Sequence, residues 1–270
     1  MSGWTPLQHK RRRRRTVPAA AQAGRRLTDA IVRPSAAAVI GATGGIGRAM
    51  VERIAASGRF ARVYALSRSG EVFLPPIRSG RLDLADEASI ADAAAAVGGE
   101  GPVGLVIIAT GLLHADGLAP DKTWRTLDPD RLARAFAVNA IGPALVAKHF
   151  LPLLPRSGRA VFAALSARVG SIEDNRLGGW YGYRASKAAL NQFVRTLAVE
   201  LARSHPDALA LALHPGTVET ELSRPFRAGI GAEGLFSPAL AAEHLLRVID
   251  TVPPDGSGQL WGWDGRRISF

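Results

Sequence analysis

The chain has 270 residues, and 47% of them are hydrophobic, so it can bury one substantial core; we expect a single α/β domain. It contains no cysteine, which excludes disulfides, thiolate nucleophiles and cysteine-ligated metals and suits a reducing cytoplasm, the location we expect. Of the net charge of +11, residues 1–34 carry +8, and the remaining 236 residues carry 25 basic and 22 acidic side chains, a net +3. The near balance beyond residue 34 argues against a nucleic-acid-binding surface on the fold.

The basic segment at the start of the chain includes the run Arg11 to Arg15 and has no apolar periodicity. Such blocks are typical of disordered extensions, so we assign residues 1–34 to an extension and residues 35–270 to the folded domain. Polyanion binding, membrane-surface binding and targeting are the alternatives for the extension. The most apolar stretches are far shorter than the roughly 20 residues of a membrane helix, so we expect no membrane span.

From Ala36 onward, short apolar runs alternate with helical patterns, which is typical of βαβ units and a parallel sheet. The runs predict seven strands, the third the weakest, at residues 36–40, 62–66, 81–84, 104–109, 159–165, 208–213 and 259–263. The helical patterns lie at residues 46–57, 87–97, 129–153, 181–204 and 238–249. We therefore expect a Rossmann-type, doubly wound, mostly parallel sheet with helices on both faces.

A glycine-rich turn, residues 41–47, separates the first predicted strand from the first helix. Glycines at such a turn let the backbone approach a pyrophosphate at a helix N-terminus. The spacing is Gly-x-x-x-Gly-x-Gly, and the alternative explanation is a tight turn with close helix packing. We assign dinucleotide binding to Gly41, Thr43, Gly45, Ile46 and Gly47.

Ser67 and Arg68 follow the second predicted strand, where an acidic residue would hydrogen-bond an unphosphorylated ribose. A guanidinium suits a 2′-phosphate instead, so Ser67 and Arg68 favour NADP(H) over NAD. The alternative is an ordinary surface arginine.

Tyr183 and Lys187 are four residues apart, which places both on one face of a helix. A neighbouring ammonium favours the phenolate and brings a tyrosine pKa toward the working range for acid–base catalysis. Together with the glycine-rich turn, the pair indicates carbonyl chemistry on a nicotinamide cofactor. The alternative is an ordinary amphipathic helix.

From Ala36 to its end, the chain resembles the short-chain dehydrogenase/reductase family. It is most similar to the carbonyl-reductase group that includes the C-factor and sniffer proteins, on residues 166–175 and 178–191. The resemblance implies a homodimer or tetramer packed through the helices at 129–153 and 181–204. It also implies that Asn139 supports a proton-relay water and that Tyr183 and Lys187 contact the cofactor. Further cofactor contacts implied by the resemblance are Asp83, Leu84, Ala109, Thr110, Gly111, Pro215, Gly216, Val218 and Thr220.

The serine that polarises the substrate carbonyl is the least certain assignment. The resemblance places it about a dozen residues before the tyrosine, whereas Ser166 precedes Tyr183 by 17. Alignment on Gly170 puts the usual catalytic place on Ala167. We assign the role to Ser166, with Ser171 as the alternative and a strand-end cap as its structural explanation.

These observations predict an NADPH-dependent oxidoreductase that reduces an aldehyde or ketone, with Tyr183 as the general acid. The segment 221–237 reads as a lid with an apolar inner face, so we expect a small hydrophobic substrate. His114 and His214 lack carboxylate or histidine partners, and we expect no metal. The alternatives are an NADP(H)-binding signalling protein with little turnover and a nucleic-acid-binding protein that depends on residues 1–34.

Overall fold

The computed structural model describes residues 35–114, 119–227, 231 and 234–270. The extension 1–34 and parts of the expected lid therefore lie outside the described residues. The strands are β1 Ala36–Ile40, β2 Arg62–Ser67, β3 Ile77–Arg81, β4 Val103–Ile108, β5 Ala160–Leu165, β6 Ala208–His214, β7 Thr217–Val218, β8 Leu235–Phe236, β9 Leu260–Gly262 and β10 Arg267–Ile268. The α-helices are α1 Gly45–Ala56, α2 Glu87–Gly98, α3 Pro129–Phe136, α4 Gly142–Phe150, α5 Tyr181–Ser204 and α6 Pro238–Thr251.

The main sheet has eight strands in the order β10-β9-β6-β5-β4-β1-β2-β3. All its neighbouring strands are parallel except β10, which runs antiparallel to β9. The predicted doubly wound α/β fold is confirmed, with eight strands rather than seven because the two-residue β10 adds an edge. β7 and β8 pair separately, beyond the carboxyl end of β6.

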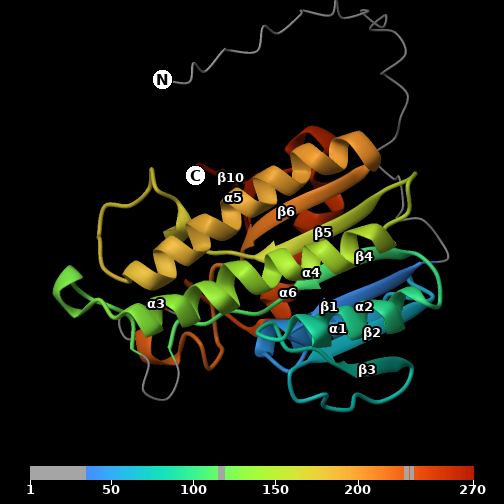
Figure 1. The fold of residues 1–270 in the computed structure, drawn as a ribbon, viewed down its shortest axis with the longest axis horizontal. Helices are drawn as coiled ribbons and strands as arrows, with labels where there is room; N and C mark the ends of the chain where they lie inside the picture. Colours follow the sequence, from blue (N-terminus) through green and yellow to red (C-terminus); the bar gives the residue numbers. More distant parts are fainter. Residues whose placement is uncertain (1–34, 115–118, 228–230, 232–233) are drawn as a thin grey trace, which may run out of the picture.

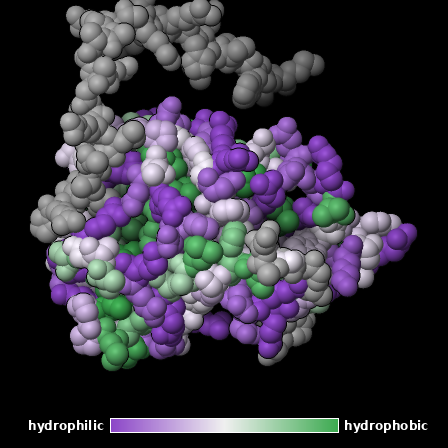
Figure 2. All heavy atoms as spheres, turned by 180° about the vertical axis from the view of Figure 1, so that it is seen from behind, coloured by the Kyte–Doolittle hydropathy of each residue, from purple (hydrophilic) through white to green (hydrophobic). Residues whose placement is uncertain are grey.

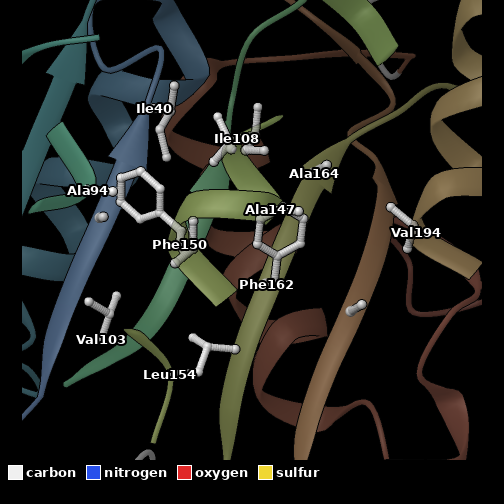
Figure 3. Packing of buried hydrophobic residues seen from close by; sticks show 14 of the residues in the cluster. Ile40, Ala94, Val103, Ile108, Ala147, Phe150, Leu154, Phe162, Ala164 and Val194 are labelled. Carbon is white, nitrogen blue, oxygen red and sulfur yellow. The ribbon is translucent and has the colours of Figure 1, made fainter. Parts of the chain in front are cut away.

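Helices cover both faces of the sheet (Figure 1). α2, α4 and α5 bury one face in a first cluster, and α1 and α6 bury the other in a second. Because both faces are covered, β1, β4 and β5 are buried along their whole length and read as continuous apolar runs. Phe150 of α4, Phe162 of β5 and Val194 of α5 lie in the first cluster (Figure 3).

The third strand lies earlier in the chain than its prediction. β3 ends at Arg81, where the predicted strand began. The prediction missed β3 because this edge strand is largely exposed and carries no apolar run. The apolar signal came instead from Leu82 and Leu84, which follow the strand and insert into the first core cluster.

The predicted helix 129–153 is interrupted by a π-helical turn, Ala137–Ile141, between α3 and α4. Pro143 has no N–H, so it cannot donate to the carbonyl of Asn139 in the α-helical manner. By length and composition, Pro129–Leu153 is the one helix among the described residues that could cross a membrane. Its buried residues Val146, Ala147 and Phe150 pack in the first core cluster, as in a core helix.

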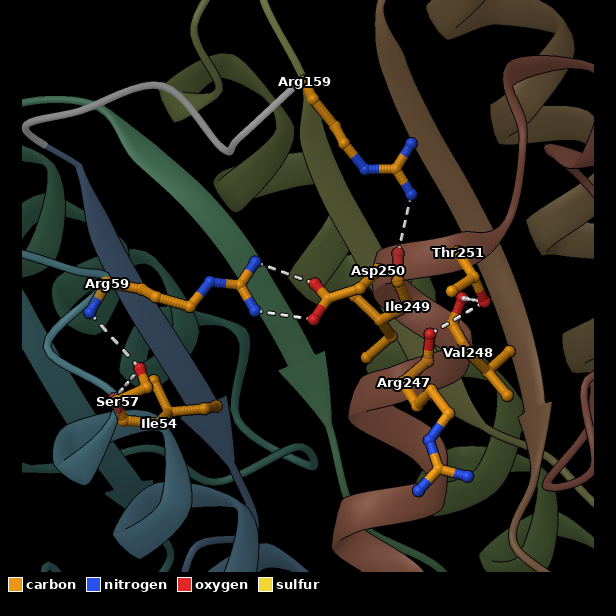
Figure 4. Close-up of polar contacts among 9 residues, drawn as sticks. All are labelled: Ile54, Ser57, Arg59, Arg159, Arg247, Val248, Ile249, Asp250 and Thr251. Carbon is orange, nitrogen blue, oxygen red and sulfur yellow. Dashed lines mark hydrogen bonds and ion pairs between the residues drawn. The ribbon is translucent and has the colours of Figure 1, made fainter. Parts of the chain in front are cut away.

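Two arginines hold the end of α6 against the rest of the fold (Figure 4). Arg59 donates from both terminal nitrogens to Asp250, at 2.6 and 2.7 Å. Arg159 donates to the carbonyls of Ile249 and Val252, at 2.6 and 3.0 Å. The last carbonyls of a helix lack intrahelical partners, so Arg159 supplies the C-terminal cap.

The face opposite to that of Figure 1 is mostly hydrophilic, with hydrophobic residues in separate groups (Figure 2).

The sheet order changes direction between β1 and β4, whose crossover connections lead to opposite faces. Ligands of doubly wound folds bind beyond the carboxyl ends of the strands at such a switch point.

Candidate active site

The glycine-rich turn connects β1 to α1 at this switch point. A Cβ on Gly47 would lie 2.2 Å from the carbonyl oxygen of Gly41, and one on Gly45 would lie 3.0 Å from Thr220 Cγ2. Gly41 has a φ of +84°, and a Cβ there would lie 2.6 Å from Thr110 Cγ2. The turn is therefore closely packed, and Gly41 and Gly47 are positions where a side chain does not fit.

The N-terminus of α1 has room for an anion. Its N-cap residue, Gly44, makes no side-chain cap, and its first turn holds no acidic residue. Thr43 and Gly45 are exposed and Ile46 is partly exposed. Unpaired N–H groups at a helix start bind phosphate, so this turn fits the pyrophosphate of a dinucleotide.

Two other segments bring predicted cofactor residues to the same edge. Ser67 ends β2, with its hydroxyl 3.3 Å from that of Ser69. Arg68 is exposed, and no carboxylate within the described chain pairs with it. Asp83 Oδ1 accepts a hydrogen bond from the N–H of Ala85 at 3.0 Å, which shapes the turn after β3.

Ala109, Thr110 and Gly111 follow β4. Thr110 Oγ1 is buried and has no hydrogen-bond partner, a state that costs free energy unless a ligand or water satisfies it. A Cβ on Gly111 would lie 3.8 Å from Lys187 Nζ and 4.0 Å from Asn139 Oδ1. An orphaned hydroxyl beside the glycine cradle fits a bound dinucleotide.

Tyr183 and Lys187 lie on one face of α5, as the spacing predicted. Lys187 Nζ lies 5.8 Å from the centre of the Tyr183 ring and donates to the carbonyl of Leu165, at the end of β5, at 2.7 Å. Burial lowers the pKa of Lys187 to about 7 and raises the pKa of Tyr183 to about 12. The expectation that Lys187 lowers the pKa of Tyr183 is therefore wrong for the protein without a bound cofactor. The loss of hydration on burial outweighs the effect of the nearby amine.

Asn139 joins the π-turn to both neighbouring elements. Its side chain exchanges two hydrogen bonds with the backbone of Leu112, both at 2.8 Å, and donates to Ser186 Oγ at 3.0 Å. Ser186 in turn donates to the carbonyl of Tyr183 at 3.0 Å. The Asn139 side chain is thus used for positioning the π-turn against Leu112 and α5.

The hydroxyl of Ser166 is hydrogen-bonded to another side chain, that of Asn191. Asn191 Nδ2 donates to the carbonyl of Gly170 at 3.3 Å, which turns its Oδ1 toward Ser166. Ser166 Oγ therefore donates its single proton to Asn191, at 2.7 Å. Ser171, the alternative, accepts from the N–H of Asp174 and is also buried. These contacts do not join Ser166 or Ser171 to Tyr183, so the predicted pair of a serine and a tyrosine is not shown by them.

The segment after β6 closes the site from the other side. Pro215 precedes Gly216, which has a φ of +77°, and a Cβ there would lie 2.7 Å from Phe236 Cε2. Val218 is buried, and β7 pairs with β8 through Thr217 to Leu235 and Val218 to Phe236. Thr220 meets the glycine-rich turn at Gly45.

Sequence reasoning gave no role to Trp180, which precedes α5. Its ring lies edge-on to Tyr183, with centroids 6.2 Å apart, and edge-on to Phe226 of the 3₁₀ turn Arg224–Phe226, at 5.0 Å. Trp180 has a left-handed backbone, with a φ of 53°, and in the sequence only the two preceding glycines could have indicated it. No group of three potential metal ligands occurs within the described ranges.

Comparisons with known proteins show which family the chain resembles. The family model described as short chain dehydrogenase matches residues 35–231. The C-signal of Myxococcus xanthus is 34% identical over 140 residues, which cover 52% of this chain and 78% of that protein. A 1-hydroxy-2-glutathionyl-2-methyl-3-butene dehydrogenase of Rhodococcus sp. (strain AD45) is 31% identical over 159 residues, 59% of this chain and 67% of that protein.

Two solved structures have a similar fold. The NADPH-bound carbonyl reductase from chicken fatty liver matches with a TM-score of 0.77 and 25% identity, over 90% of this chain and 97% of that one. The carbonyl reductase Sniffer of D. melanogaster matches with a TM-score of 0.74 and 19% identity, over 88% of this chain and 100% of that one.

Proposed function

Because the chain belongs to the short chain dehydrogenase family, we propose that it is an NADPH-dependent oxidoreductase that reduces an aldehyde or ketone to an alcohol. The observation that carries this proposal is the pair of the partly buried Tyr183 and the buried Lys187, which lies beside the carboxyl end of β5. With its pKa raised to about 12, Tyr183 is protonated at neutral pH, as a general acid must be, although the raised pKa makes it a weaker acid than an ordinary tyrosine.

The residues around the pair have separate tasks. The glycine-rich turn holds the pyrophosphate, Thr110 offers its free hydroxyl, and Lys187 holds the nicotinamide ribose. When bound, the nicotinamide supplies the hydride. Tyr183 donates the proton to the substrate oxygen. The carbonyl of Asn139, which Pro143 cannot engage, holds a water that connects Lys187 to solvent.

Polarisation of the substrate carbonyl depends on Tyr183 more than on a serine. Ser166 remains our candidate for the second hydrogen bond to the substrate oxygen, but its proton must first leave Asn191. Since a hydroxyl donates one hydrogen bond, substrate and Asn191 compete for Ser166.

The choice of NADPH over NADH rests on Arg68, which stands at the end of β2 without an ionic partner among the described residues. The chicken carbonyl reductase was solved with NADPH, whereas a 3-ketoacyl-(acyl-carrier-protein) reductase from Brucella melitensis with the same fold was solved with NADH. The fold therefore accepts either cofactor, and the side chain beside the ribose selects.

This proposal predicts the effect of Arg68→Ser on cofactor preference. Hydrogen bonds to charged groups contribute about 1.5–3 kcal/mol, so the ratio of kcat/KM for NADPH to that for NADH should fall about 10- to 150-fold. The measurement is cofactor oxidation with a panel of aldehydes, ketones and quinones. Arg176→Ser, which removes another exposed arginine, is the control and should leave the ratio unchanged. An unchanged ratio in Arg68→Ser would refute the assignment of Arg68.

A second candidate is a signalling protein that responds to NADP(H) and turns over little. Two observations favour it: the Ser166 hydroxyl already donates its proton to Asn191, and the chain is similar to the C-signal of Myxococcus xanthus. Tight NADPH binding without oxidation by any carbonyl compound would support it over the reductase.

A further inference from the structure

The backbone of Trp180 has a conformation that bulky residues rarely adopt. Its φ of 53° and ψ of 41° are left-handed, and it is the single non-glycine residue with positive φ in the described ranges. Gly178 and Gly179 before it have the same conformation, at no steric cost. Such strain persists only where the surroundings hold it, and it gathers at functional sites.

Both backbone groups of Trp180 are fixed by hydrogen bonds. Its N–H donates to the carbonyl of Asp121, at 2.5 Å, and its carbonyl accepts from the N–H of Arg184, at 2.8 Å. The indole is thereby held at the start of α5, about two helical turns before Lys187 and directly beside the ring of Tyr183.

Three segments far apart in sequence meet at the ring of Phe226. Trp180 packs edge-on against Phe226 at 62°, and Phe226 packs edge-on against His114, with centroids 5.7 Å apart. His114 Nε2 lies 3.1 Å from the carbonyls of both Glu221 and Leu222. We call Trp180, Phe226 and His114 the aromatic wall.

The charged side chains of the segment that carries Phe226 have partners or face solvent. Arg227 donates to Ser223 at 3.0 Å and pairs with Glu219 at 3.5 Å. Arg224 and Glu221 pair with each other at 3.3 Å and are 69% and 82% exposed. The aromatic wall beside Tyr183 is therefore formed by rings, and the charged side chains of its Phe226 segment do not point an unpaired charge at it, so this side of the site suits an uncharged ligand.

We propose that Trp180 is a specificity-determining residue that favours carbonyl compounds with a flat aromatic body over aliphatic ones of the same size. The inference rests on the proposed function, since the indole selects only for chemistry that occurs at Tyr183. An aromatic substrate gains a further edge-to-face or offset contact with the indole, whereas a saturated ring gains only apolar contact.

The test compares benzaldehyde with cyclohexanecarbaldehyde, which has the same carbon skeleton without a flat ring. The quantity measured is the ratio of kcat/KM for benzaldehyde to that for cyclohexanecarbaldehyde, in wild type and in Trp180→Leu. Aromatic pairs contribute about 0.5–1.5 kcal/mol beyond their buried area, so we expect the ratio to fall about 2- to 12-fold. Trp180→Phe should retain most of the ratio.

Two further variants complete the experiment. Tyr181→Leu removes a neighbouring exposed aromatic residue and should leave the ratio as in wild type. Trp180→Gly suits the left-handed backbone and gives the same measurement if Trp180→Leu does not fold. A ratio unchanged in a folded, NADPH-binding variant of Trp180 overturns this inference alone. A wild type that reduces no aldehyde or ketone overturns the proposed function and this inference with it.

Discussion

Burial has opposite effects on the two titratable side chains of the candidate site. It favours the neutral form of each, which raises the pKa of Tyr183 to about 12 and lowers the pKa of Lys187 to about 7. At neutral pH the tyrosine keeps its proton, while the lysine loses its proton more readily than an ordinary lysine. The site is therefore arranged as a proton donor beside a group that exchanges protons near neutrality.

The lowered pKa of Lys187 also predicts how stability depends on pH. Between pH 7 and about 10 the unfolded chain holds a proton on this lysine that the folded protein has lost. Unfolding then takes up a proton, so stability rises with pH across this window, by at most about 1.4 kcal/mol per pH unit from this one group. Tyr183 acts in the opposite sense only above about pH 10.

Denaturant unfolding of wild type and Lys187→Met at pH 6, 8 and 9.5 measures this contribution. We expect the free energy of unfolding of wild type to increase relative to that of the variant as the pH rises. A constant difference over this range would show that Lys187 has an ordinary pKa in the fold.

At the scale of elements, the last carbonyls of α6 are capped by a side chain from another part of the chain. Arg159 caps the carbonyls of Ile249 and Val252, which would otherwise lack partners. Leaving buried acceptors without a donor costs about 1–3 kcal/mol, so Arg159→Met should lower the free energy of unfolding by about that amount.

Arg247→Met is the matched control, because it removes an arginine of α6 whose pair with Glu243, at 3.1 Å, lies on the surface. Exposed helical pairs contribute about 0.3–0.5 kcal/mol, so its effect should be small. Equal effects of the two variants in denaturant unfolding would contradict the capping role of Arg159.

Elements were predictable where burial leaves a pattern in the sequence. β1, β4, β5 and β6 are covered on both faces and appear as apolar runs. β3 is an exposed edge strand, and β10 has two residues, so neither leaves such a run. The π-turn was not predicted, since the apolar periodicity continues through it and only Pro143 marks the place.

The same distinction applies to the candidate site. The spacing of Tyr183 and Lys187 and the glycines of the turn were readable because local geometry fixes them. The hydrogen bond of Ser166 to Asn191 and the position of Trp180 against Phe226 depend on tertiary packing between distant segments. The direction of the Tyr183 pKa was mispredicted because it depends on burial, which spacing does not report.

For the whole molecule, the resemblance to the family predicts self-association through the two long helices. Their surfaces expose apolar side chains: Phe193 and Val199 on α5, and Ile141 in the π-turn, are 39%, 45% and 49% exposed. We expect the chain, of 28.5 kDa, to form dimers or tetramers, and Phe193→Glu to shift it to monomers.

Light scattering after size exclusion gives the mass directly. Leu74→Glu changes an apolar residue that is 83% exposed, between β2 and β3, and should leave the mass unchanged. A wild type that is monomeric at every concentration would refute the expected assembly.

The central claim is that Tyr183 donates a proton during carbonyl reduction with NADPH, and Tyr183→Phe tests it most directly. The measurement is NADPH oxidation with the best aldehyde or ketone, together with NADPH affinity by fluorescence, in both proteins. General acid catalysis contributes about 10²–10⁴-fold, so kcat should fall by at least about 100-fold while NADPH affinity is retained. A Tyr183→Phe variant that reduces the substrate at the wild-type rate would contradict the account.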